Sequence, residues 1–158
     1  MFGRGGDRLP DGMYNVLALI PETSDFTLDR AVTHFAGLTF SKFRSGKAVY
    51  KKHPLRAELA RSEGKREPSG FRVFYADWAV VAWLETGRTV RGESEEMAGY
   101  DDLPAPAEVI AGCTRRLSVW SDEDPTFDWT DDFTAYTDEL RKRFGMFILD
   151  CVNGCWWT

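Results

Sequence analysis

The sequence predicts an α+β fold, and three observations support this prediction. The apolar segment 71–84 is rich in valine and aromatic residues and breaks at Ala76–Asp77, which is typical of two antiparallel strands joined by a tight turn. The pair Asn153–Gly154 predicts a second hairpin. Apolar residues recur at helical spacing in three other segments. We therefore expect a mainly antiparallel sheet built from hairpins, with about three helices packed on one face.

Length and composition predict a single domain over residues 13–158. A hydrophobic content of 43% and an aromatic content of 14% exclude a disordered chain. Glycine and charge in residues 1–12 indicate a flexible leader. No apolar run approaches the roughly 18 residues of a membrane span, and three cysteines in an acidic chain suit a reducing compartment. We therefore expect a cytoplasmic protein with free thiols and no contact with membranes.

The N-terminal part is expected to contain a strand, a helix and a basic segment. The apolar run 14–20 ends at Pro21 and predicts a buried strand. Thr27 is a suitable N-cap for a helix over the following residues, whose apolar positions have spacing i, i+3, i+4, i+7 and i+8, and Gly37 is well placed to end it. Segment 39–69 is ambiguous, with a possible strand over 48–51 and a second element over 55–61.

The C-terminal part is expected to contain two helices between strands. Residues 85–88, ETGR, predict a turn into a short strand over 89–91. A helix is predicted from Pro106, on a stripe formed by Val109, Cys113, Leu117 and Trp120. A second helix is predicted from an N-cap at Asp128 to Gly145, on the stripe Trp129, Phe133, Tyr136, Leu140 and Phe144. A strand over 146–152 then enters the final hairpin.

The charges of the chain are divided between two segments. Residues 92–139 contain fourteen acids and two bases, a balance of −12, whereas residues 42–72 contain ten bases and three acids, a balance of +7. The basic segment also contains Phe43 and Tyr50, as nucleic-acid-binding segments do. The acidic segment would repel phosphate, so nucleic acid is not an expected partner. Either the two segments compensate each other or one of them meets a charged partner.

Known catalytic and metal-binding patterns do not occur in the sequence. The only histidines, His34 and His53, lie on a helix and in a basic loop, and Cys113 lies on an apolar stripe, so no Cys–His pair is indicated. Cys151 and Cys155 flank a turn and lack the spacing of a zinc site. An EF-hand loop starting at Asp122 would place phenylalanine at both of its demanding positions. We expect no catalytic residue, no metal and no cofactor.

The segment 120–140 is the best candidate for a functional surface. It contains eight acids and no base, interleaved with aromatic residues. Helical spacing places Trp129, Phe133 and Tyr136 toward the core and the acids outward. Concentrated like charge weakens a fold, but it can steer association with a basic protein. The predicted partner-binding residues are Asp122, Glu123, Asp124, Asp128, Asp131 and Asp132.

Three segments, 71–98, 120–133 and 145–157, together resemble small bacterial α+β immunity proteins, which are encoded beside secreted polymorphic toxins. The resemblance covers roughly residues 13–158 and rests on the layout of the elements. It implies a cytoplasmic, non-enzymatic protein that binds a cognate toxin with a basic surface and blocks its active site. The alternative is a small enzyme or ligand-binding domain whose pocket lies between sheet and helices, with Trp78, Trp83 or Trp156 as walls. An adaptor in a larger complex is a third possibility.

Overall fold

The computed structural model describes residues 13–44 and 49–158, and for residues 40–44 and 49–53 it describes the backbone alone. The predicted leader and the start of the possible strand at 48–51 lie outside this part of the chain. The described elements are β1 (Asn15–Ile20), α1 (Leu28–Ala36), β2 (Thr39–Arg44), β3 (Val49–Pro54), β4 (Arg56–Ala60), β5 (Gly70–Tyr75), β6 (Trp78–Thr86), α2 (Arg88–Met97), α3 (Ala107–Ala111), β7 (Arg115–Ser121), α4 (Thr130–Phe144), β8 (Phe147–Asp150) and β9 (Cys155–Trp157).

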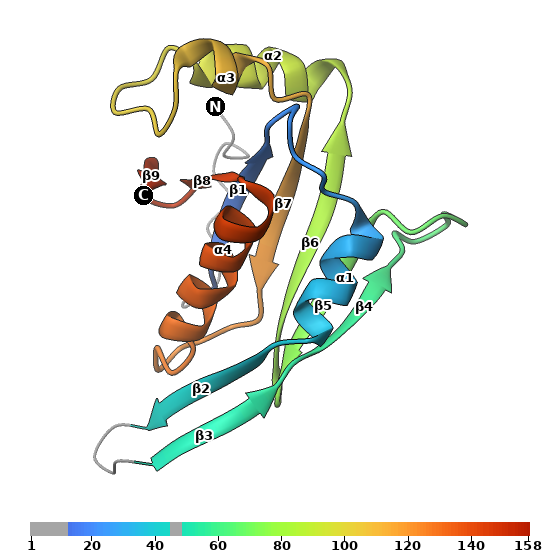
Figure 1. Ribbon diagram of the computed structural model, residues 1–158, viewed down its shortest axis with the longest axis vertical. Coiled ribbons are helices and arrows are strands. Elements are labelled where there is room, and N and C mark those ends of the chain that lie inside the picture. Colours follow the sequence, from blue (N-terminus) through green and yellow to red (C-terminus); the bar gives the residue numbers. More distant parts are fainter. Residues whose placement is uncertain (1–12, 45–48) are drawn as a thin grey trace.

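Seven of these strands form one antiparallel sheet in the order β4-β5-β6-β7-β1-β8-β9, and β2 and β3 pair as a separate ribbon (Figure 1). Together with the helices, this sheet confirms the predicted α+β class. Both predicted hairpins are confirmed. Tyr75 pairs with Trp78 across the turn Ala76–Asp77, and Asp150 pairs with Cys155 across a turn that contains Asn153 and Gly154. The ambiguous basic segment contains β2, β3 and β4.

Strand β1 lies inside the sheet, between β7 and β8. Its side chains alternate between two buried environments: Val16, Ala18 and Ile20 face one core, and Leu17 and Leu19 face another. A strand that is covered on both faces reads as a continuous apolar run, because neither alternating set of side chains meets water. This explains the uninterrupted apolar sequence at 16–20.

Helices α1 and α4 cover one face of the sheet (Figure 1). As predicted, the Thr27 side chain caps α1 by accepting a hydrogen bond from the Arg30 N–H at 3.1 Å. The two helices meet in an aromatic core in which Phe35 stacks on Tyr136 of α4 at 4.9 Å between ring centroids. Gly145 ends α4 in the left-handed conformation, with φ 69°, which a glycine adopts without strain.

The helices were predicted to pack on one face of the sheet. This is correct for α1 and α4, but α2 and α3 pack against the other face. Met97 of α2 and Ile110 of α3 are buried there against Leu17 and Leu19. Arg116 of β7 fastens α2 to the sheet, because its buried guanidinium pairs with Glu93 of α2 and with Glu85 of β6. These two helices form the bundle at the upper end of the sheet in Figure 1.

Two predicted elements are wrong. The stripe from Val109 to Trp120 is not one helix: α3 ends at Ala111, and β7 begins at Arg115. Within β7 the buried residues Leu117, Val119 and Ser121 alternate with the half-buried Ser118 and Trp120, so a period of two overrides the i+4 spacing from Cys113. The predicted strand at 89–91 belongs to α2, whose buried residues Val90, Ser94 and Met97 follow helical spacing. Among the described helices, none is both long and apolar enough to cross a bilayer.

The Tyr136 hydroxyl gives a first testable prediction. It is fully buried and has no hydrogen-bond partner among the described residues, and burial raises the pKa of this phenol well above its usual value. The Tyr136→Phe variant removes this unsatisfied group and keeps the ring. We expect its free energy of unfolding to rise by about 1 kcal/mol, measured by urea denaturation.

Tyr14→Phe is the matched control for this variant. The Tyr14 hydroxyl donates a hydrogen bond to Asp124 at 2.6 Å and lies 2.7 Å from the Thr130 hydroxyl. Its removal should lower the free energy of unfolding by about 1 to 2 kcal/mol, because the bond to a carboxylate is lost. Equal losses in the two variants would contradict the prediction.

Candidate functional site

The candidate site is the connection between β7 and α4 together with the first turn of α4, residues 122–131, here called the acidic loop. It leaves the sheet at Asp122, which still pairs with β6: the Asp122 N–H donates to the Ala79 carbonyl at 2.9 Å. The Asp122 carboxylate in turn accepts a hydrogen bond from the Ala79 N–H at 3.0 Å. The start of the loop is therefore fixed to a regular element of the sheet.

Asp124 holds the middle of the acidic loop from the inside. Its side chain is buried, and its carboxylate accepts hydrogen bonds from the N–H groups of Asp128 and Trp129, at 2.8 and 2.9 Å, and from the Tyr14 hydroxyl. Burial and the bond to Asp124 raise the pKa of Tyr14 to about 12, so this phenol stays a donor. Asp124 thus satisfies backbone donors at the entrance of α4.

Two of the six predicted partner-binding residues are therefore not part of the surface. Asp124 is buried in its capping role, which the sequence analysis had assigned to Asp128. The structure gives α4 no side-chain cap from the residue next to its first turn. Asp132 is also buried, because the inward stripe of α4 is wide enough to include it beside Phe133. Neither carboxylate is accessible to a partner protein.

The other four predicted acids are exposed. Asp128 accepts a hydrogen bond from the Thr126 hydroxyl at 2.7 Å, which stiffens the tip of the acidic loop. Glu123 and Asp131 make no ion pair or hydrogen bond within the part of the chain that the structure describes. Asp122, Glu123, Asp128 and Asp131 therefore present negative charge to solvent from a loop that is held in one shape.

Phe127 lies within the same loop and was not among the predicted site residues. Its side chain is 68% exposed, the largest value among the exposed large hydrophobic residues of the described chain. Its φ of 57° is in the left-handed region, which costs a side chain with a Cβ about 1 to 3 kcal/mol. Its N–H donates to the Asp124 carbonyl at 3.1 Å, so the turn around Asp124 maintains this conformation.

The remaining aromatic residues of the segment face inward as predicted. Phe133 and Tyr136 are fully buried. Trp129 is half-buried and stacks on Trp78, with 5.5 Å between ring centroids and parallel planes. Phe127 is therefore the aromatic residue of this loop that is left to solvent.

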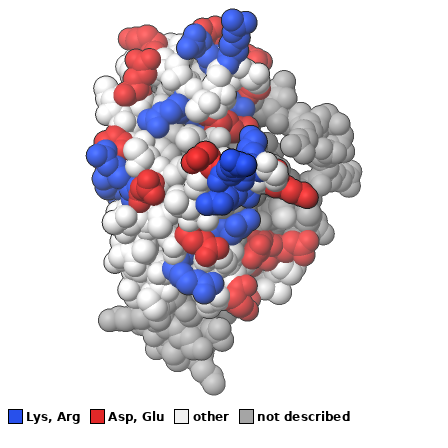
Figure 2. Space-filling model, turned by 90° about the vertical axis from the view of Figure 1, so that its right-hand side faces the viewer, with Lys and Arg blue, Asp and Glu red and all other residues white. Residues whose placement is uncertain are grey.

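Part of the strongly acidic balance of residues 92–139 is offset by ion pairs within the fold. Several of its acids are used internally: Glu93 pairs with Arg116, Asp138 with Arg141, and Glu139 with His34. On the side of the molecule that carries β4 and the turn into β5, acidic and basic side chains are intermixed (Figure 2). Exposed acids without an ion pair among the described residues lie in the acidic loop and also on α2, on α3 and in the connection between them, at Glu95, Glu96, Asp101, Asp102 and Glu108.

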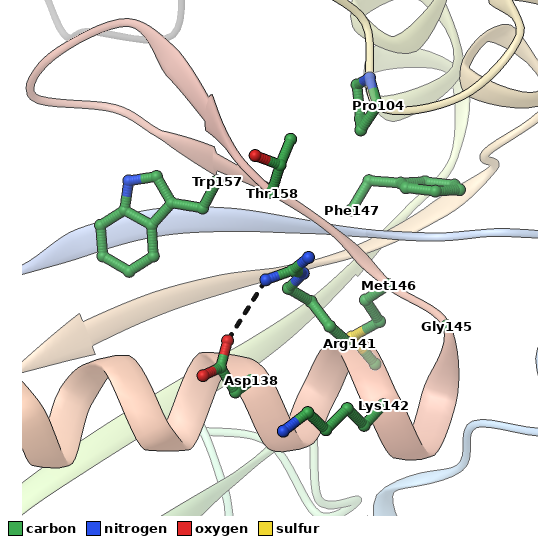
Figure 3. Close-up of a pocket in the computed structure, with 9 residues that line it drawn as sticks. All are labelled: Pro104, Asp138, Arg141, Lys142, Gly145, Met146, Phe147, Trp157 and Thr158. Atoms are coloured by element: carbon green, nitrogen blue, oxygen red, sulfur yellow. Dashed lines mark hydrogen bonds and ion pairs between the residues drawn. The ribbon is translucent and has the colours of Figure 1, made fainter.

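Two pockets in the described part of the chain have walls that differ from those predicted. A pocket of about 400 Å³ lies between the end of α4, the start of β8 and the end of β9 (Figure 3). A second one, of about 360 Å³, lies beside His34, Arg30 and Arg143. None of the three predicted wall residues lines either pocket. Trp78 is buried, and Trp83 and Trp156 are half-buried elsewhere.

The settings of Cys113, Cys151 and His34 do not indicate a catalytic or metal centre at these residues. Burial raises the pKa of Cys113 and of Cys151 to about 11, so both thiols remain protonated and weakly nucleophilic near neutral pH. His34 Nε2 lies 2.9 Å from a Glu139 carboxylate oxygen and links α1 to α4. Among the side chains that the structure describes, no three of His, Cys, Asp or Glu converge in a way that could hold a metal ion.

Comparison of the chain with protein-family models, with curated proteins and with solved structures finds no match. The fold and the site define a class: an α+β domain that presents a fixed acidic loop with one exposed aromatic residue.

Proposed function

We propose that the protein is a non-catalytic inhibitor of the immunity type, which binds a basic partner protein through its acidic loop. The exposure of Phe127 on a loop fixed by Asp124 is the observation that carries this proposal. A large apolar side chain that is held in solvent at a cost in backbone strain is accounted for if it enters a pocket on a partner.

The surroundings of Phe127 suit such a contact. Aromatic anchors at interface centres contribute most when a polar rim excludes water around them. Asp122, Glu123, Asp128 and Asp131 would form this rim, and their charge would accelerate encounter with a basic surface. Because the loop is already ordered, little conformational entropy would be lost on binding. The resemblance to immunity proteins suggests a toxin as the partner, with a basic active site or a surface next to one.

The test uses the protein encoded next to this chain as the probe. We expect it to form a one-to-one complex with the inhibitor and to lose its toxicity. Phe127→Ala should weaken the complex by about 2 kcal/mol or more, which is roughly thirtyfold in Kd, as measured by calorimetry. Glu123→Lys combined with Asp131→Lys should slow association and reduce its salt dependence, as measured by stopped-flow fluorescence.

The charge-reversal pair is chosen because neither acid has an intramolecular partner to lose. Glu63→Lys combined with Glu95→Lys is the matched control, since both residues are exposed and lie outside the acidic loop, and the two substitutions change the net charge by the same amount. Equal association rates for the two double variants would contradict the assigned face. If the Phe127→Ala variant binds the partner with unchanged affinity, Phe127 is not the anchor of the complex.

A further inference from the structure

The pocket between α4, β8 and β9, here called the C-terminal pocket, is a second candidate binding site on the molecule. It forms because Gly145 turns the chain sharply at the end of α4, so that β8 starts beside the last turn of the helix. Pro104, from the connection between α2 and α3, closes it on another side (Figure 3). Its volume of about 400 Å³ is in the range of sites that hold small ligands.

The C-terminal pocket is lined by a cation, Arg141, that uses few of its hydrogen-bond donors within the described chain. Arg141 extends from α4 toward β8, and its Nη1 donates to Asp138 at 3.2 Å (Figure 3). A guanidinium has five N–H donors, and the described residues provide Arg141 with no other side-chain partner. Asp138 therefore orients the guanidinium and leaves most of its donors available. Lys142, at the rim, has no ion pair within the described chain.

Helix electrostatics accounts for part of this arrangement, since cations at a helix C-terminus are stabilising wherever they point. The neighbouring Arg143 is a cation at the same helix end that is paired within the fold, unlike Arg141. Its guanidinium makes two hydrogen bonds to the Asp25 carboxylate, at 2.9 and 3.2 Å, and is used within the fold. Arg141 points into a cavity instead, where an anionic ligand could accept its free N–H groups.

The walls of the pocket add a preference for a flat molecule. The Trp157 indole is held in place, because its Nε1–H donates to Asp150 at 3.1 Å and its ring meets the Phe133 ring edge-on at 5.9 Å. Phe147 and Pro104 stand on the other side of Arg141 (Figure 3). Rigid aromatic walls on two sides of a cation favour a ring that carries a negative group.

We propose that the C-terminal pocket binds a small planar molecule that carries a carboxylate or a phosphate. Arg141 binds the anionic group, Lys142 adds positive charge at the rim, and Trp157 and Phe147 contact the ring. The site is separate from the acidic loop, so it does not depend on the proposed inhibitor function. It also differs from the ligand site that the sequence suggested, because its aromatic walls are other residues.

The test is a titration of the full chain followed by ¹H–¹⁵N NMR, with phenyl phosphate and benzoate as separate probes. We expect saturable shifts of the Trp157 indole N–H with at least one probe. The Trp78 indole N–H, which is bonded to the Asp122 carbonyl in another part of the fold, should not move. The probe that binds more tightly identifies the anionic group as phosphate or carboxylate.

Arg141→Gln should weaken the tighter probe roughly tenfold, because charge-assisted hydrogen bonds are lost. Arg91→Gln, at an exposed position of α2, is the matched control and should bind as the unchanged protein does. Equal affinity in the two variants, or no shift at Trp157 with either probe up to about 10 mM, would overturn the proposal. If inorganic phosphate binds as tightly as phenyl phosphate, the role of the aromatic walls is wrong.

Discussion

Replacing Asp124 by alanine is expected to lower the free energy of unfolding by about 3 kcal/mol. The variant leaves two backbone N–H groups at the entrance of α4 and the Tyr14 hydroxyl without their acceptor. Each of these groups lies in a partly buried setting, where an unmatched donor costs about 1 to 3 kcal/mol. Urea denaturation followed by circular dichroism measures the loss, and the amides of Asp128 and Trp129 should exchange with solvent faster.

Glu123→Ala is the matched control for Asp124→Ala. The two acids are neighbours, but Glu123 is exposed and makes no hydrogen bond within the described chain, so its loss should change stability by less than about 0.5 kcal/mol. Similar losses in the two variants would show that charge in this loop matters more than its hydrogen bonds. Faster amide exchange in Asp124→Ala alone would show that this carboxylate maintains the shape that exposes Phe127.

Gly70→Ala is the second variant for which we expect a large loss, again about 3 kcal/mol. A Cβ atom at this position in β5 would lie 2.3 Å from the Ala82 carbonyl oxygen and 2.7 Å from a ring carbon of Trp83. The first of these atoms belongs to the backbone of β6, so the clash cannot be relieved by a change of rotamer. The strands would have to separate locally, which should appear as a lower urea midpoint.

Gly92→Ala provides the opposite control. Gly92 lies in the exposed part of α2, and a Cβ atom there would meet no atom within 4 Å beyond its chain neighbours and the backbone of its own helix. Alanine is the better helix former, so this variant should gain about 0.5 to 1 kcal/mol. A loss in both variants would contradict the steric explanation for Gly70.

The sequence correctly predicted those elements whose pattern and end signals all lie within the element itself. The helix 130–144 has an apolar stripe, a favourable charge distribution and a terminal glycine, and both hairpins have turn residues at their centres. The segment 107–121 failed because Cys113, Leu117 and Trp120 fit helical spacing by coincidence. Leu117 and Val119 are the apolar residues of β7 that are buried, and only contacts with β1 and β6 favour this period.

The sequence predicted which segment carries the functional surface. Only the fold shows which acids of that segment are exposed and which are buried. Asp124 and Asp132 have the same chemistry as Asp128 and Asp131, and nothing nearby in the sequence marks them for burial. For Asp124, the deciding partner is Tyr14, which lies 110 positions away. Phe127 was missed because its exposure depends on a left-handed backbone angle, which composition does not reveal. One signal was present: Phe127 does not fit the stripe that begins at Trp129.

The central place of β1 has a consequence for how the chain acquires its structure. This strand precedes the other described strands in the sequence, yet its partners are β7 and β8, which lie far along the chain. Contacts between distant positions slow folding, because long loops must close before the contacts are gained. We therefore expect both edges of β1 to stay unpaired, and both of its apolar faces to stay exposed to solvent, until β7 and β8 have been synthesised. The pairing of β1 with β7 and β8 should then set the folding rate. The chain should be most prone to aggregation before this pairing has formed.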